Sequence, residues 1–189
     1  MPIRPDQFVL GIDPDTHHAG LALVSAPRVE RLAVGAIDRG ARGFAAAAGV
    51  ADAVAEELLR WVDELRPHVA RIVIESQRIY PGARSKARPE DILRLGWAAG
   101  GILVAARLAF PNVPPEEVWI VEPRTWCGTV GKSISQRRIR ARLLWTPGCD
   151  ALMRAQHKSH VTDAAGLAAW GCDDANGLRG GVERLPAQT

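Results

Sequence analysis

The stretch FVLGIDPDTHHAGLAL (residues 8–23) decides the class of fold. It is an apolar run too short for an amphipathic helix, interrupted by an acid and a proline, and it then resumes as a second apolar run. This pattern predicts a strand, a turn and a returning strand. Asp13 ends the first strand in hydrophobic surroundings, where an isolated carboxylate is costly. We therefore expect a cation or hydrogen-bond donors close to Asp13.

A second acid ends another strand. The segment ARIVIESQ (residues 70–77) is rich in β-branched residues and reaches Glu75 at its polar end. Ligands bind beyond the ends of strands in many α/β sheets. Taken one at a time, Asp13 and Glu75 are equally well explained as acids that cap a turn or the N-terminus of a helix.

The run SHVTDAAGLAAW (residues 159–170) supplies two more candidate ligands. It predicts an apolar helix with Ser159 as its N-cap. His160 and Asp163 are three residues apart, so the imidazole and the carboxylate project from the same face of its first turn. Read alone, such a pair is more often a cap and a dipole partner at a helix N-terminus than a metal site.

Together, the three acids and the histidine form a donor set suited to divalent cations. A nuclease can use two such ions, about 3.5–4 Å apart, one to activate water and one to stabilise the leaving oxygen. We expect His160 to bind or orient through its neutral imidazole. The combination favours a metal site over four unrelated structural roles.

Composition indicates one domain in a reducing compartment. The chain has 189 residues and 47% hydrophobic content, which suffices for one core. We predict a nuclease domain over 1–175 and a flexible tail over 176–189. The net charge of +3 permits a nucleic-acid partner, and three cysteines without C-x-x-C spacing argue against a zinc ribbon or a disulfide framework. No signal peptide is evident, and Arg94 and Arg107 interrupt the apolar run at 92–108, so we expect a cytoplasmic protein that does not use a membrane.

The order of elements is predicted as β-β-β-α-β-α-β-α-α. The expected strands are 8–12, 19–25, 31–37, 70–75 and 117–121. The expected helices are 43–65, 89–108, 134–144 and the helix that carries His160. This order, with acids at the ends of the first and fourth strands, is similar to the ribonuclease H-like fold, an α/β fold with a mixed five-stranded sheet and helices on both faces.

Within that fold, the chain resembles the RuvC family of Holliday junction resolvases. Five segments carry the resemblance, in the family's order: GIDP (11–14), IE (74–75), RLGWAAGGILVAA (94–106), VGKS (130–133) and HVTDA (160–164). The resemblance implies that Asp13, Glu75, His160 and Asp163 are the metal-binding catalytic residues. It also implies Mg²⁺ or Mn²⁺ as the cofactor, with two ions per site.

The resemblance further implies a homodimer that acts on branched DNA, a four-way junction. Its interface uses the helix over 89–108. The residues offer independent support, because several small side chains on this helix let two helices approach closely: Gly96, Ala98, Ala99, Gly100 and Gly101. The same helix is also suited to packing on its own sheet.

The sequence departs from the family at two positions. Asp15 stands where the family usually has glycine, and it is either an additional ligand or a turn residue. Arg78 stands where many members carry an aromatic residue that stacks in the junction. Tyr80 is close enough in sequence to serve instead, and stacking on a base contributes about 1–3 kcal/mol.

Basic residues near the predicted site are candidates for DNA binding. Phosphate contacts from such groups position a duplex without reading its sequence. We predict contacts from Arg78, Tyr80, Arg84, Lys86, Arg88, Lys132, Arg137, Arg138 and Lys158. Lys132 and Lys158 are the candidates for groups close to the scissile phosphate.

The sequence excludes a P-loop protein and an actin-like ATPase. VGKS fails as a P-loop because Trp126 stands where the motif needs glycine, and an actin-like ATPase needs two duplicated domains. Two alternatives stay open. One is a related nuclease that cuts RNA-DNA hybrids or processes precursor RNA, and the other is a catalytically silent, structure-specific DNA-binding protein.

Overall fold

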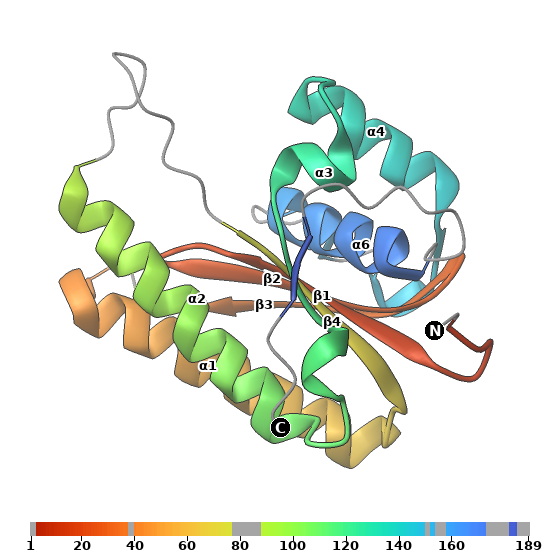
Figure 1. Ribbon diagram of the computed structural model, residues 1–189, viewed down its shortest axis with the longest axis horizontal. Coiled ribbons are helices and arrows are strands. Elements are labelled where there is room, and N and C mark those ends of the chain that lie inside the picture. The colour runs from red at the N-terminus through yellow and green to blue at the C-terminus, as the bar shows by residue number, and fades with distance from the viewer. Residues whose placement is uncertain are drawn as a thin grey trace.

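A single mixed sheet forms the centre of the computed structural model (Figure 1), which describes residues 3–37, 40–76, 88–149, 152–153, 158–172 and 182–184. Within these residues the sheet has seven strands, in the order β6-β3-β2-β1-β4-β5-β7. The strands are β1 Phe8–Pro14, β2 His18–Ser25, β3 Arg28–Ala36, β4 Val69–Glu75, β5 Val118–Val121, β6 Leu144–Trp145 and β7 Val182–Arg184.

The five predicted strands are confirmed, and two short edge strands extend the predicted sheet. β6 and β7 have only two and three residues, too few to show the alternation that identifies a strand in sequence. β7 pairs antiparallel with β5, although it lies in the segment expected as a flexible tail. These three residues therefore belong to the sheet, whereas the domain boundary at 175 stays a prediction.

Helices cover both faces of the sheet, as predicted (Figure 1). α1 (Gly43–Leu65) and α2 (Pro89–Ala109) lie on one face. The other face carries α3 (Pro123–Cys127), α4 (Lys132–Arg142) and α6 (Lys158–Cys172). The short helix α3 was not predicted, since five residues give no helical period.

Two apolar layers hold these helices to the sheet. Successive side chains of a strand point to opposite faces. In β1, Leu10 and Ile12 therefore pack toward α1 and α2, whereas Val9 packs toward α6. Because both faces are covered, the central strands are continuously apolar rather than alternating. Asp13 and Glu75, at the ends of β1 and β4, are exceptions to this apolar pattern.

α2 combines burial with an exposed apolar face. Among the helices that the structure describes, it alone has the length and the composition to cross a membrane. It lies against α1, and Ala98, Ile102 and Ala106 are buried in the core. The opposite side carries a row of exposed side chains, the α2 stripe, made of Leu93, Trp97, Gly100, Val104 and Leu108.

Candidate active site

Asp13 and Glu75 lie side by side at one end of the sheet. β1 and β4 are parallel neighbours, and Ile12 is paired with Ile74. The next residue on each strand is an acid, so both carboxylates emerge on the face covered by α6. Asp13 is 5% exposed, and Glu75 is half-buried. The two strand-end acids predicted from sequence are thus brought together by the register of one strand pair.

Two glycines let α6 approach the sheet at this point. A Cβ atom at Gly11 would lie 2.0 Å from the carbonyl oxygen of Ala164, and one at Gly20 would lie 2.2 Å from that of His160. Gly20 is paired with Asp13 across β1 and β2. The first turn of α6 therefore rests on the backbone beside Asp13. Sequence reasoning did not single out these glycines, although glycine inside a strand often marks a close backbone approach.

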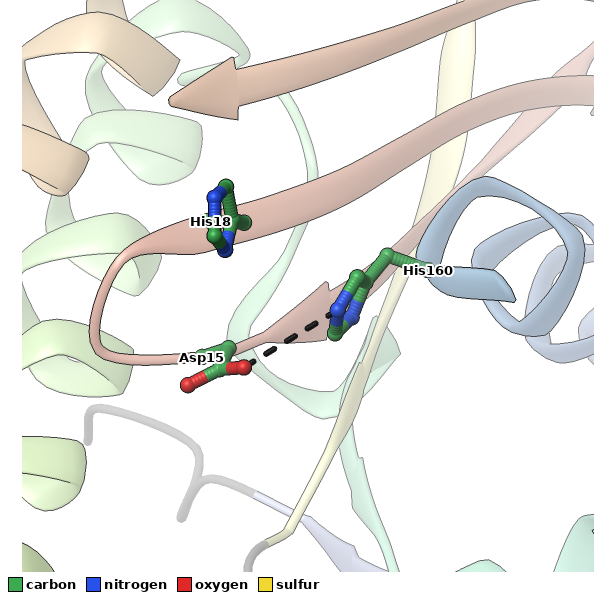
Figure 2. A group of neighbouring side chains, drawn as sticks. All are labelled: Asp15, His18 and His160. Atoms are coloured by element: carbon green, nitrogen blue, oxygen red, sulfur yellow. Dashed lines mark ion pairs between the residues drawn. The ribbon is translucent and has the colours of Figure 1, made fainter. Parts of the chain in front are cut away.

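The imidazole of His160 lies between two acids. Its Nδ1 atom is 3.0 Å from Oδ2 of Asp13, and its Nε2 atom is 3.9 Å from Oδ2 of Asp15 (Figure 2). The Asp13 contact joins residues 147 positions apart in the chain. Asp13 and His160 are therefore hydrogen-bond partners. When the Asp13 carboxylate is ionised it can only accept, so in that state the imidazole supplies the proton.

Asp163 and Glu75 have their own partners. Lys132 Nζ lies 2.7 Å from Oδ2 of Asp163, and Gln136 Nε2 lies 3.0 Å from Oδ1 of the same group. Trp126 Nε1 donates to Oε2 of Glu75 over 2.9 Å. Trp126 and Gln136 were not identified from sequence, since neither residue type signals a role unless its neighbours are known. All four predicted ligands thus meet at one place.

Crowding of carboxylates makes this site attractive to a cation. Burial raises the pKa of Asp13 above its usual value, and the negative charge of Asp163 adds to the effect. Burial and the charge of Asp13 raise the pKa of Glu75 to about 7. The hydrogen bond to Asp13 raises the pKa of His160. A bound cation would stabilise the ionised forms of Asp13 and Glu75, which burial and the neighbouring negative charges disfavour.

The donor set fits a hard divalent cation. The three carboxylates of Asp13, Glu75 and Asp163 provide oxygen ligands of the kind that Mg²⁺ and Mn²⁺ take. The ammonium group of Lys132 already lies against Asp163, where positive charge compensates the acids. Burial alone would lower the pKa of Lys132, but its hydrogen bond to Asp163 raises it, so this cation stays charged.

A cavity of ≈ 500 Å³ leads from these acids toward the protein surface. Glu75, Asp163, Lys132, Trp126 and Arg124 are among the residues that line it. Arg124 is exposed and basic, and it is absent from the residues expected to bind DNA. Two basic side chains, Lys132 and Arg124, therefore line the same cavity as two of the carboxylates.

Comparison with known proteins rests on structure. No family model matches the chain, and no curated protein matches it. Among solved structures, Thermus thermophilus RuvC in complex with a Holliday junction substrate superposes with a TM-score of 0.66 at 23% identity. The comparison covers 95% of this chain and 100% of the other. The chain has the RuvC fold. A second Thermus thermophilus RuvC structure gives a TM-score of 0.61 at 21% identity, with the same coverage.

The RuvC fold confirms the predicted fold class, and it leaves the roles of individual residues to be tested. Of the candidate DNA-binding residues, Arg88, Lys132, Arg137, Arg138 and Lys158 lie within the described chain, and all five are exposed. Lys132 is the one in contact with a site acid. The remaining candidates, Arg78, Tyr80, Arg84 and Lys86, lie outside the described residues.

Gly20 gives a direct test of how this RuvC fold assembles its site. We expect Gly20→Ala to push α6 away from β2, because the new methyl group would overlap the His160 carbonyl. Both stability and any activity that needs the His160 contact with Asp13 should fall, the former by about 1–3 kcal/mol as for other overpacked sites. Urea unfolding measures the first effect. Gly96→Ala is the matched control, since its added Cβ meets no atom within 4 Å among the described residues outside its chain neighbours and its own helix backbone. Equal stability of the two variants would contradict this account.

The raised pKa of Glu75 predicts that the free energy of unfolding of the metal-free protein decreases as pH rises. The folded-state pKa of about 7 exceeds the ordinary value of 4.5. Between these values the folded state holds more protons than the unfolded state, so the stability that protonated Glu75 contributes falls as pH rises through this window and is absent above it. Glu75→Gln should remove that loss. Urea unfolding at pH 5 and pH 8 in the presence of a chelator tests it, and an unchanged pH dependence would refute the shift.

Proposed function

We propose that this protein is a metal-dependent endonuclease that resolves four-way DNA junctions. The observation that carries the proposal is the meeting of Asp13, Glu75, His160 and Asp163 at one end of the sheet in a RuvC fold. The solved relative bound to a Holliday junction substrate supports junction DNA as the substrate. These four side chains suit the divalent cations that nucleases use to hydrolyse a phosphodiester.

The proposed cofactor is Mg²⁺ or Mn²⁺, with two ions per site. When bound, the ions would activate the attacking water and stabilise the leaving oxygen. Asp13, Glu75, His160 and Asp163 would hold them. Trp126 orients the carboxylate of Glu75 through its indole N–H. His160 contacts Asp13 through Nδ1, and its Nε2 atom faces Asp15.

Basic groups around the site would hold the phosphate backbone. Lys132 lies closest to the acids, and it can contact a substrate phosphate when a metal ion takes over the charge of Asp163. Arg137 and Arg138 project from α4, and Lys158 begins α6. Their contacts would position the DNA strand without reading its sequence. Arg78, Tyr80, Arg84 and Lys86 stay predictions from sequence.

We also propose that the working form is a twofold dimer joined through α2. Leu93, Trp97, Val104 and Leu108 of the α2 stripe are 57, 63, 58 and 76% exposed. Their spacing places them on one side of the helix. Contiguous apolar patches of this kind mark interaction surfaces, and Gly100 in the middle of the stripe permits close approach of a second helix. A symmetric partner also matches the symmetry of a four-way junction. This surface would then be covered by protein rather than by a membrane, consistent with a cytoplasmic enzyme.

A nicking assay tests the proposed activity. Wild-type protein with Mg²⁺ or Mn²⁺ should cut a synthetic four-way junction in preference to linear duplex and to an RNA-DNA hybrid, and a chelator should stop the reaction. Preference for the hybrid would favour the related hybrid-cutting nuclease. Junction binding without cleavage under any of these conditions would identify a catalytically silent DNA-binding protein, although all four predicted ligands lie together.

A further inference from the structure

A second cavity, of ≈ 310 Å³, lies beside the cavity that leads to the carboxylates. The two cavities are adjacent, because they share the lining residues Trp126, Cys127, Val130 and Ser135. The remaining lining residues of the second cavity, the α4–α6 cavity, come from α4, from the C-terminal half of α6 and from the turn between β2 and β3. We propose that the α4–α6 cavity binds one nucleotide unit, a planar base together with its phosphate.

The walls of the α4–α6 cavity are fixed by close packing of α3 and α4 on α6. A Cβ atom at Gly166 would lie 2.6 Å from Cδ1 of Ile139 and 2.7 Å from Cζ3 of Trp126, so both side chains rest directly on the backbone of α6. Sites for small ligands are usually preformed and measure about 300–1,000 Å³. The α4–α6 cavity lies at the lower end of that range, so it can take a single nucleotide but not a duplex.

Two indole rings line the cavity and offer surfaces for a base. Trp126 belongs to α3 and Trp170 to the last turn of α6, and both are half-buried. An edge-to-face contact with the buried ring of Trp119, with centroids 5.8 Å apart, holds Trp170 in place. Aromatic side chains bind unpaired bases by stacking, which depends little on the identity of the base. The two rings therefore favour a flat, aromatic ligand.

Two guanidinium groups supply the positive charge that a phosphate requires. Arg138 and Arg142 are four residues apart on α4, so they lie on the same face of that helix. Both are exposed, and neither has an ion-pair partner among the described residues. The described residues that line the cavity include no acid. Because arginine can form two parallel hydrogen bonds with a phosphate, this lining complements an anion.

Ser135 adds a hydroxyl group to the same cavity. The residue is only 7% exposed, and it lines both cavities. Its hydroxyl group has no hydrogen-bond partner within the part of the chain that the structure describes. A buried hydroxyl is costly unless it is hydrogen-bonded, and it can donate or accept. It is therefore available to a base or a phosphate in the cavity.

Trp126 connects the α4–α6 cavity with the proposed active site. Its side chain lines both cavities, and its Nε1 atom donates to Oε2 of Glu75 over 2.9 Å. A base stacked on this indole would hold it in place, and with it the carboxylate of Glu75. We expect the nucleotide to belong to the DNA strand that is cut, an expectation that rests on the proposed function. A free nucleotide has the same chemistry, and the experiment distinguishes the two sources.

Nucleotide binding to the metal-free full chain is measured without any cleavage. We expect a deoxynucleoside monophosphate, titrated into ¹⁵N-labelled protein, to shift the indole N–H signals of Trp126 and Trp170. Inorganic phosphate and deoxyribose phosphate should shift them far less, because they lack the base. Trp126→Phe and Trp170→Phe assign the two signals, since each variant removes one.

Arginine variants test the phosphate contacts. Arg138→Gln and Arg142→Gln should each weaken nucleotide binding by about tenfold, because a hydrogen bond to a charged group is lost. Both residues are exposed, so neither change should disturb the fold. Arg60→Gln is the matched control, since Arg60 is an exposed arginine of α1, on the opposite face of the sheet. Its affinity should equal that of the wild type.

Cleavage with Mg²⁺ identifies the source of the nucleotide. An abasic site replaces, in turn, each nucleotide near the cut phosphate of a four-way junction. A strand nucleotide in the cavity predicts one position at which the abasic site slows the wild type by about tenfold or more. The same abasic site should not slow Trp170→Leu further, because that variant keeps an apolar side chain but has lost the stacking surface. If no position matters and an added free nucleotide changes the rate, the cavity binds a free nucleotide.

Two results would overturn the proposed nucleotide site. One is that no deoxynucleoside monophosphate shifts the Trp126 and Trp170 signals, and the other is equal nucleotide affinity in Arg138→Gln, Arg142→Gln and Arg60→Gln. Cleavage that responds neither to an abasic site nor to a free nucleotide would refute the connection through Trp126. Failure of the nuclease is distinguishable, since a protein that cuts no junction can still bind a nucleotide in the metal-free titration.

Discussion

Asp13→Asn should reduce cleavage of a four-way junction by roughly 100-fold or more while leaving junction binding largely intact. The amide keeps the shape of the carboxylate and can still form a hydrogen bond with His160 Nδ1. It lacks the charge that a divalent cation requires. Loss of one group that stabilises charge in a transition state typically costs 100-fold to 1,000-fold in rate. Glu75→Gln and Asp163→Asn should behave in the same way, for the same reason.

The measurement separates chemistry from binding. Single-turnover cleavage of an end-labelled junction gives the rate, and a gel shift of the same junction in Ca²⁺ gives the affinity, which rests mainly on phosphate contacts elsewhere. Asp6→Asn is the matched control, since Asp6 is an exposed acid that precedes β1, at the opposite end of the strand from Asp13. A wild-type rate in any of the three site variants would show that the proposed site is wrong.

Gly100→Arg should convert the protein to monomers and abolish paired incision. Apart from the backbone of its own helix and its chain neighbours, no atom of the described residues lies within 4 Å of a Cβ at Gly100, so the arginine side chain has open space in the isolated subunit. In a dimer joined through the α2 stripe, the guanidinium would be buried without a partner, at a cost of several kcal/mol. We expect the dissociation constant of the dimer to rise by about 100-fold or more.

Sedimentation velocity measures the oligomeric state, and a cruciform-bearing supercoiled plasmid measures coordination. Paired cuts give linear product, whereas independent single cuts give nicked circles that accumulate first. Gly100→Ala is the control, because it keeps a small residue in the stripe and should remain dimeric. Wild-type protein that sediments as a monomer, both free and on a junction, would refute the dimer. That outcome would favour the nuclease that acts on RNA-DNA hybrids or precursor RNA.

The sequence by itself determined the central elements and the identity of the site candidates. The five predicted strands follow from short apolar runs bounded by turn residues, and the long helices follow from apolar patterns that repeat over enough residues to show a helical period. Asp13 and Glu75 were recognisable as acids at strand ends, and His160 and Asp163 as a pair on one helix face. These signals depend only on residues close to one another in the chain.

Tertiary structure alone decided how these parts meet. The register of β1 with β4 places Asp13 beside Glu75, and the pairing of Asp13 with Gly20 sets where α6 rests. Strand order, β6 and β7 depend on contacts between distant segments, which local periodicity does not encode. Trp126 and Gln136 likewise gain their roles from partners 51 and 27 residues away.

The same distinction explains the two roles open to Asp15. As a sequence feature, Asp15 fits a turn residue better than an additional ligand, and both roles stay open. In the folded chain its Oδ1 atom is bound by Thr16, as in a turn, and its Oδ2 atom faces His160 from the far end of the sequence. The ligand atoms of a metal site must lie within a few ångströms of one another. In this protein, only the packing of α6 onto Gly11 and Gly20 brings His160 this close to Asp15.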